Sequence, residues 1–329
     1  MSHPVPFVPH PWLRNGHVMT VFSWGRRRPA PPGLPKPVVR LFDVAPGTQV
    51  SADCYWQPEP ASRPALLALH GLEASSAAHY MLGMAGKAYA AGLSVVLLNQ
   101  RNCGNTEHLG PGLYHSGLTG DPAYVLNELV CHDGIRRIGV AGYSLGGNLA
   151  LKLAGDYGTH PPAALRAVCA VSPVLELSDC VHALERPMNV VYQWNFVRQL
   201  RARMRRKAAH WPGAFPVERL RSIHTVRQFD DVFTAPHFGF NGAEDYYHRA
   251  SSMRVVDRIH VPTLVITAAD DPFVPAAMFD APELRENPFI TTLVTRQGGH
   301  CGFISAAGSG DDGYWAETSI VNFVREHVD

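Results

Sequence analysis

Most of the chain alternates between short apolar runs and longer segments in which apolar and polar residues mix with helical spacing. The apolar runs lack polar alternation, which is typical of strands that are buried on both faces of a parallel sheet. The longer segments end at glycine or begin with helix-starting residues such as Asp121 and Pro122. The predicted strands are Ala65–Leu69, Ser94–Leu98, Arg137–Ala141, Ala167–Val171, Thr263–Thr267 and Ile290–Val294. The predicted helices are Tyr80–Ala91, Asp121–Leu129 with Asp121 as its N-cap, Gly146–Tyr157, a segment near Met278–Glu286, and Tyr314–Glu326.

The first part of the chain follows a different pattern. Residues 1–40 are rich in proline, which predicts an irregular arm. We expect the arm to cover an edge of the sheet; as an alternative, its segment Asn15–Thr20 shapes the entrance to a site. The next segments, Val38–Val44 and Val50–Gln57, alternate enough to predict two strands around the Pro46-Gly47 turn.

The strand–helix alternation also stops between about residues 175 and 259. This stretch contains a basic helical segment, Asn195–Lys207, followed by proline and glycine breaks and aromatic residues. An insertion over the carboxyl edge of a parallel sheet is typical of a lid. The sequence therefore predicts an α/β fold organised as an arm (1–40), a catalytic core (41–174 and 260–329) and an inserted, mainly helical lid (175–259).

Composition excludes several classes of protein. The chain has 329 residues, of which 46% are hydrophobic, so it can bury a large core. A net charge of +1 argues against a dedicated nucleic-acid binder. No apolar stretch is long enough to predict a membrane-spanning helix. The start lacks the features of a secretory signal, so we expect a cytoplasmic protein whose six cysteines are reduced. Neither CxxC nor HExxH spacing occurs, and we expect no metal site.

The balanced net charge hides a strong segregation. Residues 1–40 contain six basic and no acidic residues, and residues 198–229 contain nine basic residues and one acidic residue. The rest of the chain carries the compensating negative charge. This division either docks the arm and the lid onto an acidic core or presents a positive entrance to anionic substrates.

The strongest chemical signal is the segment Gly142-Tyr143-Ser144-Leu145-Gly146. It matches the G-x-S-x-G pattern and lies between a predicted strand and a predicted helix, which is the context that a nucleophile elbow requires. Small residues at Gly142 and Gly146 let the strand and the helix approach each other. Ser144 is therefore the candidate nucleophile, at the positive end of a helix dipole.

The partners of such a serine follow in the order acid, then histidine. Two carboxylates, Asp270 and Asp271, come directly after the predicted strand Thr263–Thr267. We favour Asp271, which precedes Pro272, and expect Asp270 to be a turn or capping residue. His300 follows the next strand and is the only histidine between Pro262 and Glu326.

These three residue types have defined roles in acyl transfer. Ser144 attacks a carbonyl, His300 accepts its proton, and Asp271 orients and stabilises the imidazole. The expected oxyanion donors are the backbone N–H groups of Leu145 and of Leu72, in the loop His70-Gly71-Leu72-Glu73. We expect the His70 side chain to organise this loop and Glu73 to make a structural hydrogen bond, although Glu73 could instead orient substrate.

Several motifs resemble the YheT-like esterase group of the α/β-hydrolase superfamily, over nearly the whole chain. They are His70-Gly71-Leu72-Glu73, Gly142-Tyr143-Ser144-Leu145-Gly146-Gly147-Asn148, Ala235-Pro236-His237-Phe238-Gly239-Phe240, Asp270-Asp271-Pro272-Phe273, Asn15-Gly16-His17-Val18-Met19-Thr20, Tyr114-His115-Ser116-Gly117 and Asp245-Tyr246-Tyr247. The resemblance implies an α/β-hydrolase fold and a carboxylesterase with the triad Ser144, Asp271 and His300. Eukaryotic relatives of this group include phospholipase-like enzymes.

We therefore expect a serine hydrolase that cleaves carboxylic esters of short to medium acyl chains through an acyl-enzyme, without a cofactor. The alternatives are a phospholipase, lysophospholipase or thioesterase that uses the same triad. A non-catalytic binding module is disfavoured because the predicted triad is complete.

The predicted lid leaves two questions open. Its basic run is expected to be a solvated helix face, although it could contact an anionic head group or a membrane surface. That run consists of Arg198, Arg201, Arg203, Arg205, Arg206 and Lys207. Trp194, Phe196 and Met204 either line an acyl pocket or simply pack the lid.

Overall fold

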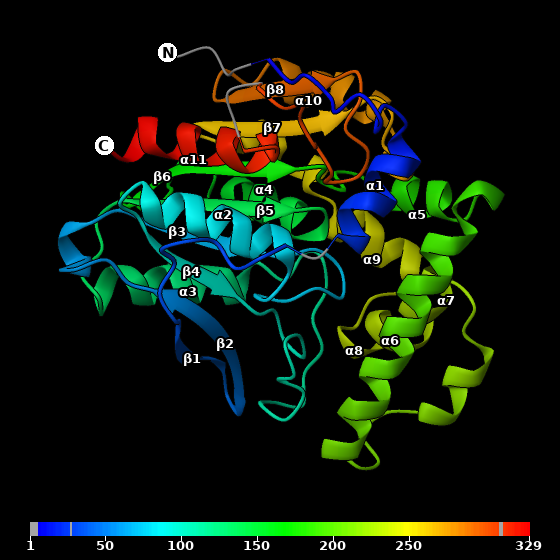
Figure 1. Ribbon diagram of the computed structural model, residues 1–329. Coiled ribbons are helices and arrows are strands. Elements are labelled where there is room, and N and C mark those ends of the chain that lie inside the picture. The colour runs from blue at the N-terminus through cyan, green and yellow to red at the C-terminus, as the bar shows by residue number, and fades with distance from the viewer. Residues whose placement is uncertain (1–5, 27, 309–311) are drawn as a thin grey trace.

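One twisted sheet organises the molecule, which a computed structural model describes at residues 6–26, 28–308 and 312–329 (Figure 1). In this part of the chain, eight strands lie in the order β1-β2-β4-β3-β5-β6-β7-β8. The strands are β1 (Val38–Ala45), β2 (Thr48–Tyr55), β3 (Ala65–Leu69), β4 (Ser94–Leu98), β5 (Ile138–Tyr143), β6 (Leu165–Val171), β7 (Thr263–Ala268) and β8 (Ile290–Thr295). The β1–β2 and β2–β4 pairs are antiparallel and the other pairs are parallel, so the predicted mostly parallel sheet is confirmed.

Alternate residues of the central strands enter two separate hydrophobic clusters. In β3, Ala65, Leu67 and Leu69 join the cluster that contains the apolar faces of helices α3 (Gly120–Cys131) and α4 (Leu145–Tyr157). The intervening Leu66 and Ala68 face the cluster built on α2 (His79–Ala90) and α11 (Trp315–Val328). All five residues of this strand are buried, because helices cover both faces of the sheet.

The segment between β6 and β7 folds mainly into helices. Figure 1 shows its long helix α6 passing beyond the carboxyl ends of the strands. Apolar residues of α6, among them Phe196 and Leu200, continue the cluster that holds α3 and α4. The elements of this segment are α5 (Leu177–Leu184), η2 (Pro187–Asn189), α6 (Val190–His210), η3 (Val217–Ser222), α7 (Val226–Phe229), η4 (Asp230–Thr234), α8 (Ala235–His237), α9 (Ala243–Ala250), η5 (Ser252–Arg254) and η6 (Val256–Arg258).

Two helix predictions were wrong in detail. The helix predicted near Met278–Glu286 consists of two short pieces, η7 (Ala276–Asp280) and α10 (Pro282–Arg285). Pro282 has no N–H to continue a helix and forces Ala281 into an extended conformation with ψ 135°. The N-cap position of α3 is occupied by Thr119 and not by Asp121. The Asp121 carboxylate instead accepts two hydrogen bonds from Arg101.

The arm is not irregular throughout. It contains the helix α1 (Gly16–Gly25), whose N-cap Asn15 accepts a hydrogen bond from the Val18 amide, 3.2 Å away. A further short 3-10 turn, η1 (Pro60–Ser62), precedes β3. Figure 1 shows α1 close to the inserted segment, on the side of the molecule where the parallel strands end.

Candidate active site

Ser144 lies in the sharp turn between β5 and α4, with φ 55° and ψ −118°. This positive φ is strained for a residue with a side chain. A Cβ atom on Gly142 would lie 2.0 Å from the carbonyl oxygen of Gly146, and one on Gly146 would lie 2.3 Å from that of Leu69. Both flanking positions therefore require glycine, while Tyr143, the last residue of β5, is buried in the core.

The loops after β7 and β8 bring two further side chains to Ser144. His300 Nε2 lies 2.8 Å from Ser144 Oγ, and His300 Nδ1 lies 2.8 Å from Asp271 Oδ2. The side chains of Asp271 and His300 are 0% and 4% exposed. The three predicted residues therefore form one hydrogen-bonded chain, although they are far apart in sequence.

Neighbouring groups hold the carboxylate and the imidazole in place. Asp271 Oδ1 accepts hydrogen bonds from the amides of Phe273 and Val274, at 3.1 and 3.0 Å. The Phe273 ring lies 4.0 Å from the His300 ring, centroid to centroid. Burial disfavours the charged imidazole, but the adjacent Asp271 carboxylate outweighs this and raises the pKa of His300 above its usual value.

The adjacent carboxylate, Asp270, has a different partner. Its Oδ1 accepts a hydrogen bond from the Gly299 amide, 2.9 Å away, which ties the loop after β7 to the loop after β8. Burial raises the pKa of Asp270. Asp271 and not Asp270 therefore contacts the imidazole, and Asp270 has the turn-stabilising contact that the sequence predicts.

The two candidate oxyanion donors flank Ser144. Leu145 is the first residue of α4, so its N–H lies at the positive end of the helix dipole. Leu72 belongs to the loop after β3, and β3 pairs with β5 so that Leu69 is opposite Gly142. Leu72, Ser144 and Leu145 line the same cavity.

Tyrosine hydroxyls fix the loop that carries Leu72. The Gly71 amide donates to the Tyr80 hydroxyl, 3.0 Å away, and the Glu73 amide donates to the Tyr114 hydroxyl, 3.1 Å away. The amides on either side of Leu72 are thus committed to protein acceptors. Leu72 is therefore the candidate donor of this loop.

The buried His70 side chain also stabilises this loop. It is fully buried, its Nε2 accepts a hydrogen bond from the Gln100 amide at 3.1 Å, and its Nδ1 lies 2.8 Å from the Gly71 carbonyl oxygen. Burial lowers the pKa of His70 to about 4, so the ring is neutral and can donate from Nδ1 while accepting at Nε2. These contacts agree with the organising role that the sequence predicts.

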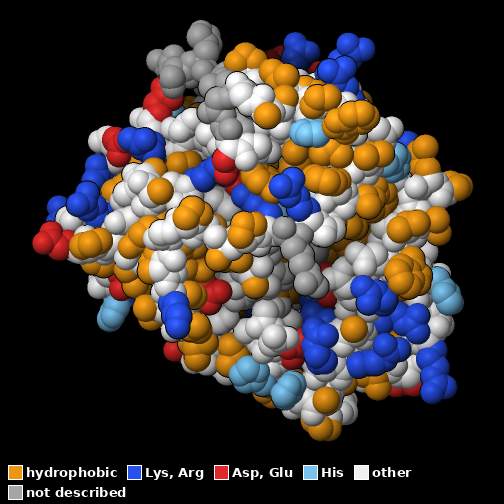
Figure 2. All heavy atoms as spheres, viewed as in Figure 1, with side chains coloured by type: hydrophobic (Ala, Val, Ile, Leu, Met, Phe, Trp, Pro, Cys, Tyr) orange, Lys and Arg blue, Asp and Glu red, His pale blue; other side chains and the backbone are white. Residues whose placement is uncertain are grey.

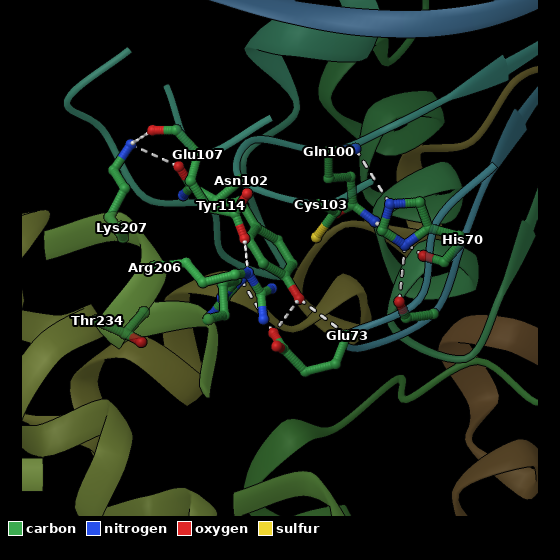
Figure 3. Close-up of polar contacts among 12 residues, drawn as sticks. His70, Glu73, Gln100, Asn102, Cys103, Glu107, Tyr114, Arg206, Lys207 and Thr234 are labelled. Atoms are coloured by element: carbon green, nitrogen blue, oxygen red, sulfur yellow. Dashed lines mark hydrogen bonds and ion pairs between the residues drawn. The ribbon is translucent and has the colours of Figure 1, made fainter. Parts of the chain in front are cut away.

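A buried ion pair connects the oxyanion loop to α6. Arg203 Nη1 lies 3.0 Å from Glu73 Oε1, and both side chains are about as buried as core residues, at 5% and 4% exposed. The Tyr114 hydroxyl donates a hydrogen bond to Glu73 Oε1 at 3.1 Å, and the two side chains point toward one another in Figure 3. Glu73 thus has a structural contact, as predicted, but its partner is a residue of the inserted segment.

The basic run of α6 is only partly solvated, so that prediction was wrong for Arg203 and Lys207. Lys207 is fully buried and donates to Asn102 Oδ1 at 2.6 Å and to the Glu107 carbonyl oxygen at 3.1 Å (Figure 3). Arg203 and Lys207 are four positions apart and therefore lie on one helix face. The sequence signal for this burial was the spacing, because Arg203 and Lys207 share a helix face with the apolar residues Leu200 and Met204.

The arm helix α1 contacts the loop that carries His300. The His300 amide donates to Thr20 Oγ1, 2.8 Å away, and Thr20 is fully buried. His17 Nδ1 lies 3.1 Å from the Tyr192 hydroxyl of α6. The sequence motif that contains His17 and Thr20 thus joins the site to the inserted segment.

Two cavities meet at Ser144. The inner cavity has a volume of about 90 Å³ and lies between α4 and the inserted segment. Its apolar lining includes Phe196, which also packs in the hydrophobic core, whereas Met204 is buried in that core and Trp194 is 64% exposed. Three of its polar lining residues bond one another: Asp230 accepts hydrogen bonds from Thr234 and Tyr247, at 2.7 and 2.8 Å.

The outer cavity is larger, at about 280 Å³, and opens between α1 and α6. Both Ser144 and His300 line it, whereas His300 is not among the described residues that line the inner cavity. Its wall is mainly apolar but includes the polar side chains of Ser23, Glu73, His79, Asn195 and Gln199. No Lys or Arg occurs among the described residues of this wall.

Residues 6–26, 28–308 and 312–329 contain no group of three or more His, Cys, Asp or Glu residues with the geometry of a metal site. No helix in these ranges is both long and apolar enough to cross a bilayer. All six cysteines lie within the described ranges, and each is a free thiol.

Comparison with known proteins places this geometry in a family. A family model for the alpha/beta hydrolase fold matches residues 64–307. YheT of Escherichia coli, named as an esterase, is 31% identical over 333 residues, which cover 100% of this chain and 95% of that protein. A protein of Mus musculus named phospholipase ABHD3 is 28% identical over 89% of this chain and 74% of its own length.

Solved structures support the fold. The 2,6-dihydroxy-pseudo-oxynicotine hydrolase superposes with a TM-score of 0.62 at 18% identity, covering 95% of this chain and 72% of the other. The Pyrococcus furiosus esterase Pf2001 superposes with a TM-score of 0.56 at 17% identity, covering 99% of this chain and 100% of the other. The relatives support ester hydrolysis as the general activity. The chain is therefore a hydrolase that belongs to the α/β-hydrolase family and, within it, to the YheT-like esterase group.

Proposed function

We propose that this protein is a serine esterase that cleaves carboxylic esters of short to medium acyl chains through an acyl-enzyme. The observation that carries the proposal is the chain Asp271–His300–Ser144, in which both spacings are 2.8 Å and the serine faces two cavities. A serine is a weak nucleophile unless a base accepts its proton, and this arrangement supplies that base.

The proposed reaction uses only groups of this chain and water. Ser144 Oγ attacks the ester carbonyl carbon while His300 Nε2 accepts the hydroxyl proton. The N–H groups of Leu145 and Leu72 stabilise the oxyanion of the tetrahedral intermediate. When the intermediate collapses, His300 gives its proton to the leaving alcohol. Water, activated by His300, then attacks the acyl-enzyme, releases the acid and restores Ser144.

We assign one half of the substrate to each cavity. The leaving alcohol must lie within reach of His300, because His300 protonates it. His300 lines the outer cavity together with Ser144, so we place the alcohol there and the acyl chain in the inner cavity. An inner cavity of about 90 Å³ admits roughly six to nine water-sized groups. That size favours short to medium acyl chains over long ones.

The wall of the outer cavity favours a neutral alcohol over a charged one. An ionised phosphate there would lose its hydration without gaining a cation from the described lining residues. His79 also lines this cavity, and its Nδ1 is a buried atom with no hydrogen-bond partner among the described residues. Burial lowers the pKa of His79 to about 4, so the ring is neutral and suits a hydroxyl group. Phosphate-bearing and thioester substrates remain the second candidates.

A paired substrate panel tests the proposal. We expect turnover of p-nitrophenyl esters to be highest at about four to eight acyl carbons and to fall steeply for palmitate, since the inner cavity is short. Glycerol mono-octanoate should be a better substrate than an octanoyl lysophospholipid with an anionic head group. All of this turnover must disappear in Ser144→Ala; turnover that survives would reject the assignment of the nucleophile.

A further inference from the structure

The outward face of α1 is apolar although it faces solvent. Val18, Val21 and Phe22 are 49%, 54% and 39% exposed, and their spacing places them on one side of the helix. A helix of a soluble domain normally turns such a face toward the core. Here the core-facing side is formed instead by Met19 and the polar Thr20, both fully buried.

The start of α6 repeats this pattern. Val190, Val191 and Trp194 are 61%, 65% and 64% exposed, and Met188 just before the helix is 67% exposed. Large apolar side chains exposed singly are ordinary, but contiguous ones mark an interaction site. Figure 2 shows hydrophobic side chains gathered over the region where α1 and the first part of α6 lie in Figure 1.

Ring contacts hold the two apolar faces side by side. Trp24 of α1 lies edge-on to Tyr192 and Phe196 of α6, at centroid distances of 5.4 and 5.6 Å. Trp24 is itself 38% exposed and lines the outer cavity together with Phe196. The exposed residues of α1 and of the start of α6 therefore form one apolar rim at the entrance to the outer cavity, which we call the entrance rim.

Exposed arginines lie beside the entrance rim. Arg14, Arg26, Arg186 and Arg198 are exposed next to its two helices. The sequence contains no Asp or Glu from residue 1 to residue 42 or from residue 186 to residue 217. Further basic side chains of α6 lie beyond the rim, and Figure 2 shows Lys and Arg gathered below the hydrophobic area.

We propose that the entrance rim docks on an anionic lipid surface. Apolar and aromatic side chains flanked by arginine match the two layers of such a surface, the acyl boundary and the anionic head groups. Docking there would place the outer cavity over the membrane, so that an ester leaving the lipid enters directly at Ser144. A second copy of this chain is a poorer occupant, because two rims would bring their arginines together.

The test is vesicle flotation of the full chain. Wild type should float with vesicles of phosphatidylcholine and phosphatidylglycerol, and weakly with phosphatidylcholine alone. Salt at about 0.5 M should reduce binding because it screens the arginines. The double variant Phe22→Ser/Trp194→Ser should bind at least about tenfold more weakly than wild type, because it loses two aromatic anchors.

A matched control comes from the opposite edge of the sheet. Val39 and Leu41 of β1 are 64% and 47% exposed, and Val39→Ser/Leu41→Ser should bind vesicles like wild type. Two results would overturn the proposal: wild type that does not float, or dimerisation in solution that Phe22→Ser/Trp194→Ser abolishes. Ser144→Ala should bind vesicles normally and Phe22→Ser/Trp194→Ser should hydrolyse a soluble butyrate ester normally, so docking and catalysis are tested separately.

Discussion

The backbone amide of His300 donates a hydrogen bond to the hydroxyl of Thr20, 2.8 Å away. The same hydroxyl donates to the carbonyl oxygen of Gly16 at 2.7 Å, so Thr20 links the first turn of α1 to the loop after β8. Gly299 packs closely here: a Cβ atom on it would lie 2.5 Å from the Gly16 carbonyl oxygen. Thr20 thus fixes the position of the proposed base, and it is not among the described residues that line either cavity.

Removing this hydroxyl should therefore affect catalysis more than binding. We expect Thr20→Val to lower kcat about tenfold with little change in KM, because the His300 loop loses one buried hydrogen bond of roughly 1–2 kcal/mol. Thr20→Ser keeps the hydroxyl and should retain most of the activity. Steady-state kinetics on a soluble ester measures this, and equal losses in both variants would argue against a positioning role.

The two neighbouring aspartates should behave very differently. Asp271→Asn should lower kcat by about 10⁴-fold, because the imidazole loses its orienting carboxylate. Asp270→Asn keeps a side-chain oxygen that can accept from the Gly299 amide, so it should lose no more than about tenfold. Kinetics of the purified variants decides between them, and the reverse order of losses would exchange the roles of the two residues.

The pH dependence of kcat/KM tests the contact between Asp271 and His300 independently. His300 must be unprotonated to accept the Ser144 proton, so kcat/KM falls as the pH drops through the pKa of His300. The Asp271 carboxylate raises this pKa, which places the acidic limb above the usual value for histidine. Asp271→Asn removes the charge, so its residual activity should show this limb at lower pH. An unchanged limb would show that another group controls the profile.

The buried pair between Arg203 and Glu73 should contribute to stability. Arg203→Met leaves the Glu73 carboxylate buried without its cation, and we expect the free energy of unfolding to fall by about 3–5 kcal/mol. Arg205→Met, on the exposed side of the same helix, should change it by less than about 0.5 kcal/mol. Urea unfolding measures both variants.

A double variant separates the lost pair from lost packing. Arg203→Met/Glu73→Gln removes both charges, so it should be more stable than Arg203→Met alone. If the losses of unfolding free energy in Arg203→Met and in Glu73→Gln simply add in the double variant, the ion pair does not couple α6 to the oxyanion loop.

The sequence predicted the sheet and the order of the three site residues because both leave local signals. Continuous apolar runs mark buried strands, and Ser144 is enclosed by glycines that close packing requires. The order serine, acid, histidine then limited the candidates to Asp270, Asp271 and His300. The choice between Asp270 and Asp271 depends on where each side chain points, which the loop geometry decides.

The sequence did not predict features that depend on distant partners. Arg203 and Lys207 belong to a run of arginines typical of solvent, but Glu73 and the carbonyl oxygens near Glu107 stabilise them when buried. The position of the arm likewise depends on Thr20 meeting His300, 280 residues later in the chain. No local pattern contains either contact.

Labelling by a fluorophosphonate tests the central claim most directly, because only an activated serine reacts with this probe. Intact mass should show one adduct per chain, and peptide mapping should locate it on Ser144. Ser144→Ala should not be labelled, and Asp271→Asn should be labelled far more slowly. A modified serine elsewhere, or no labelling of a folded wild-type protein, would contradict Ser144 as the nucleophile.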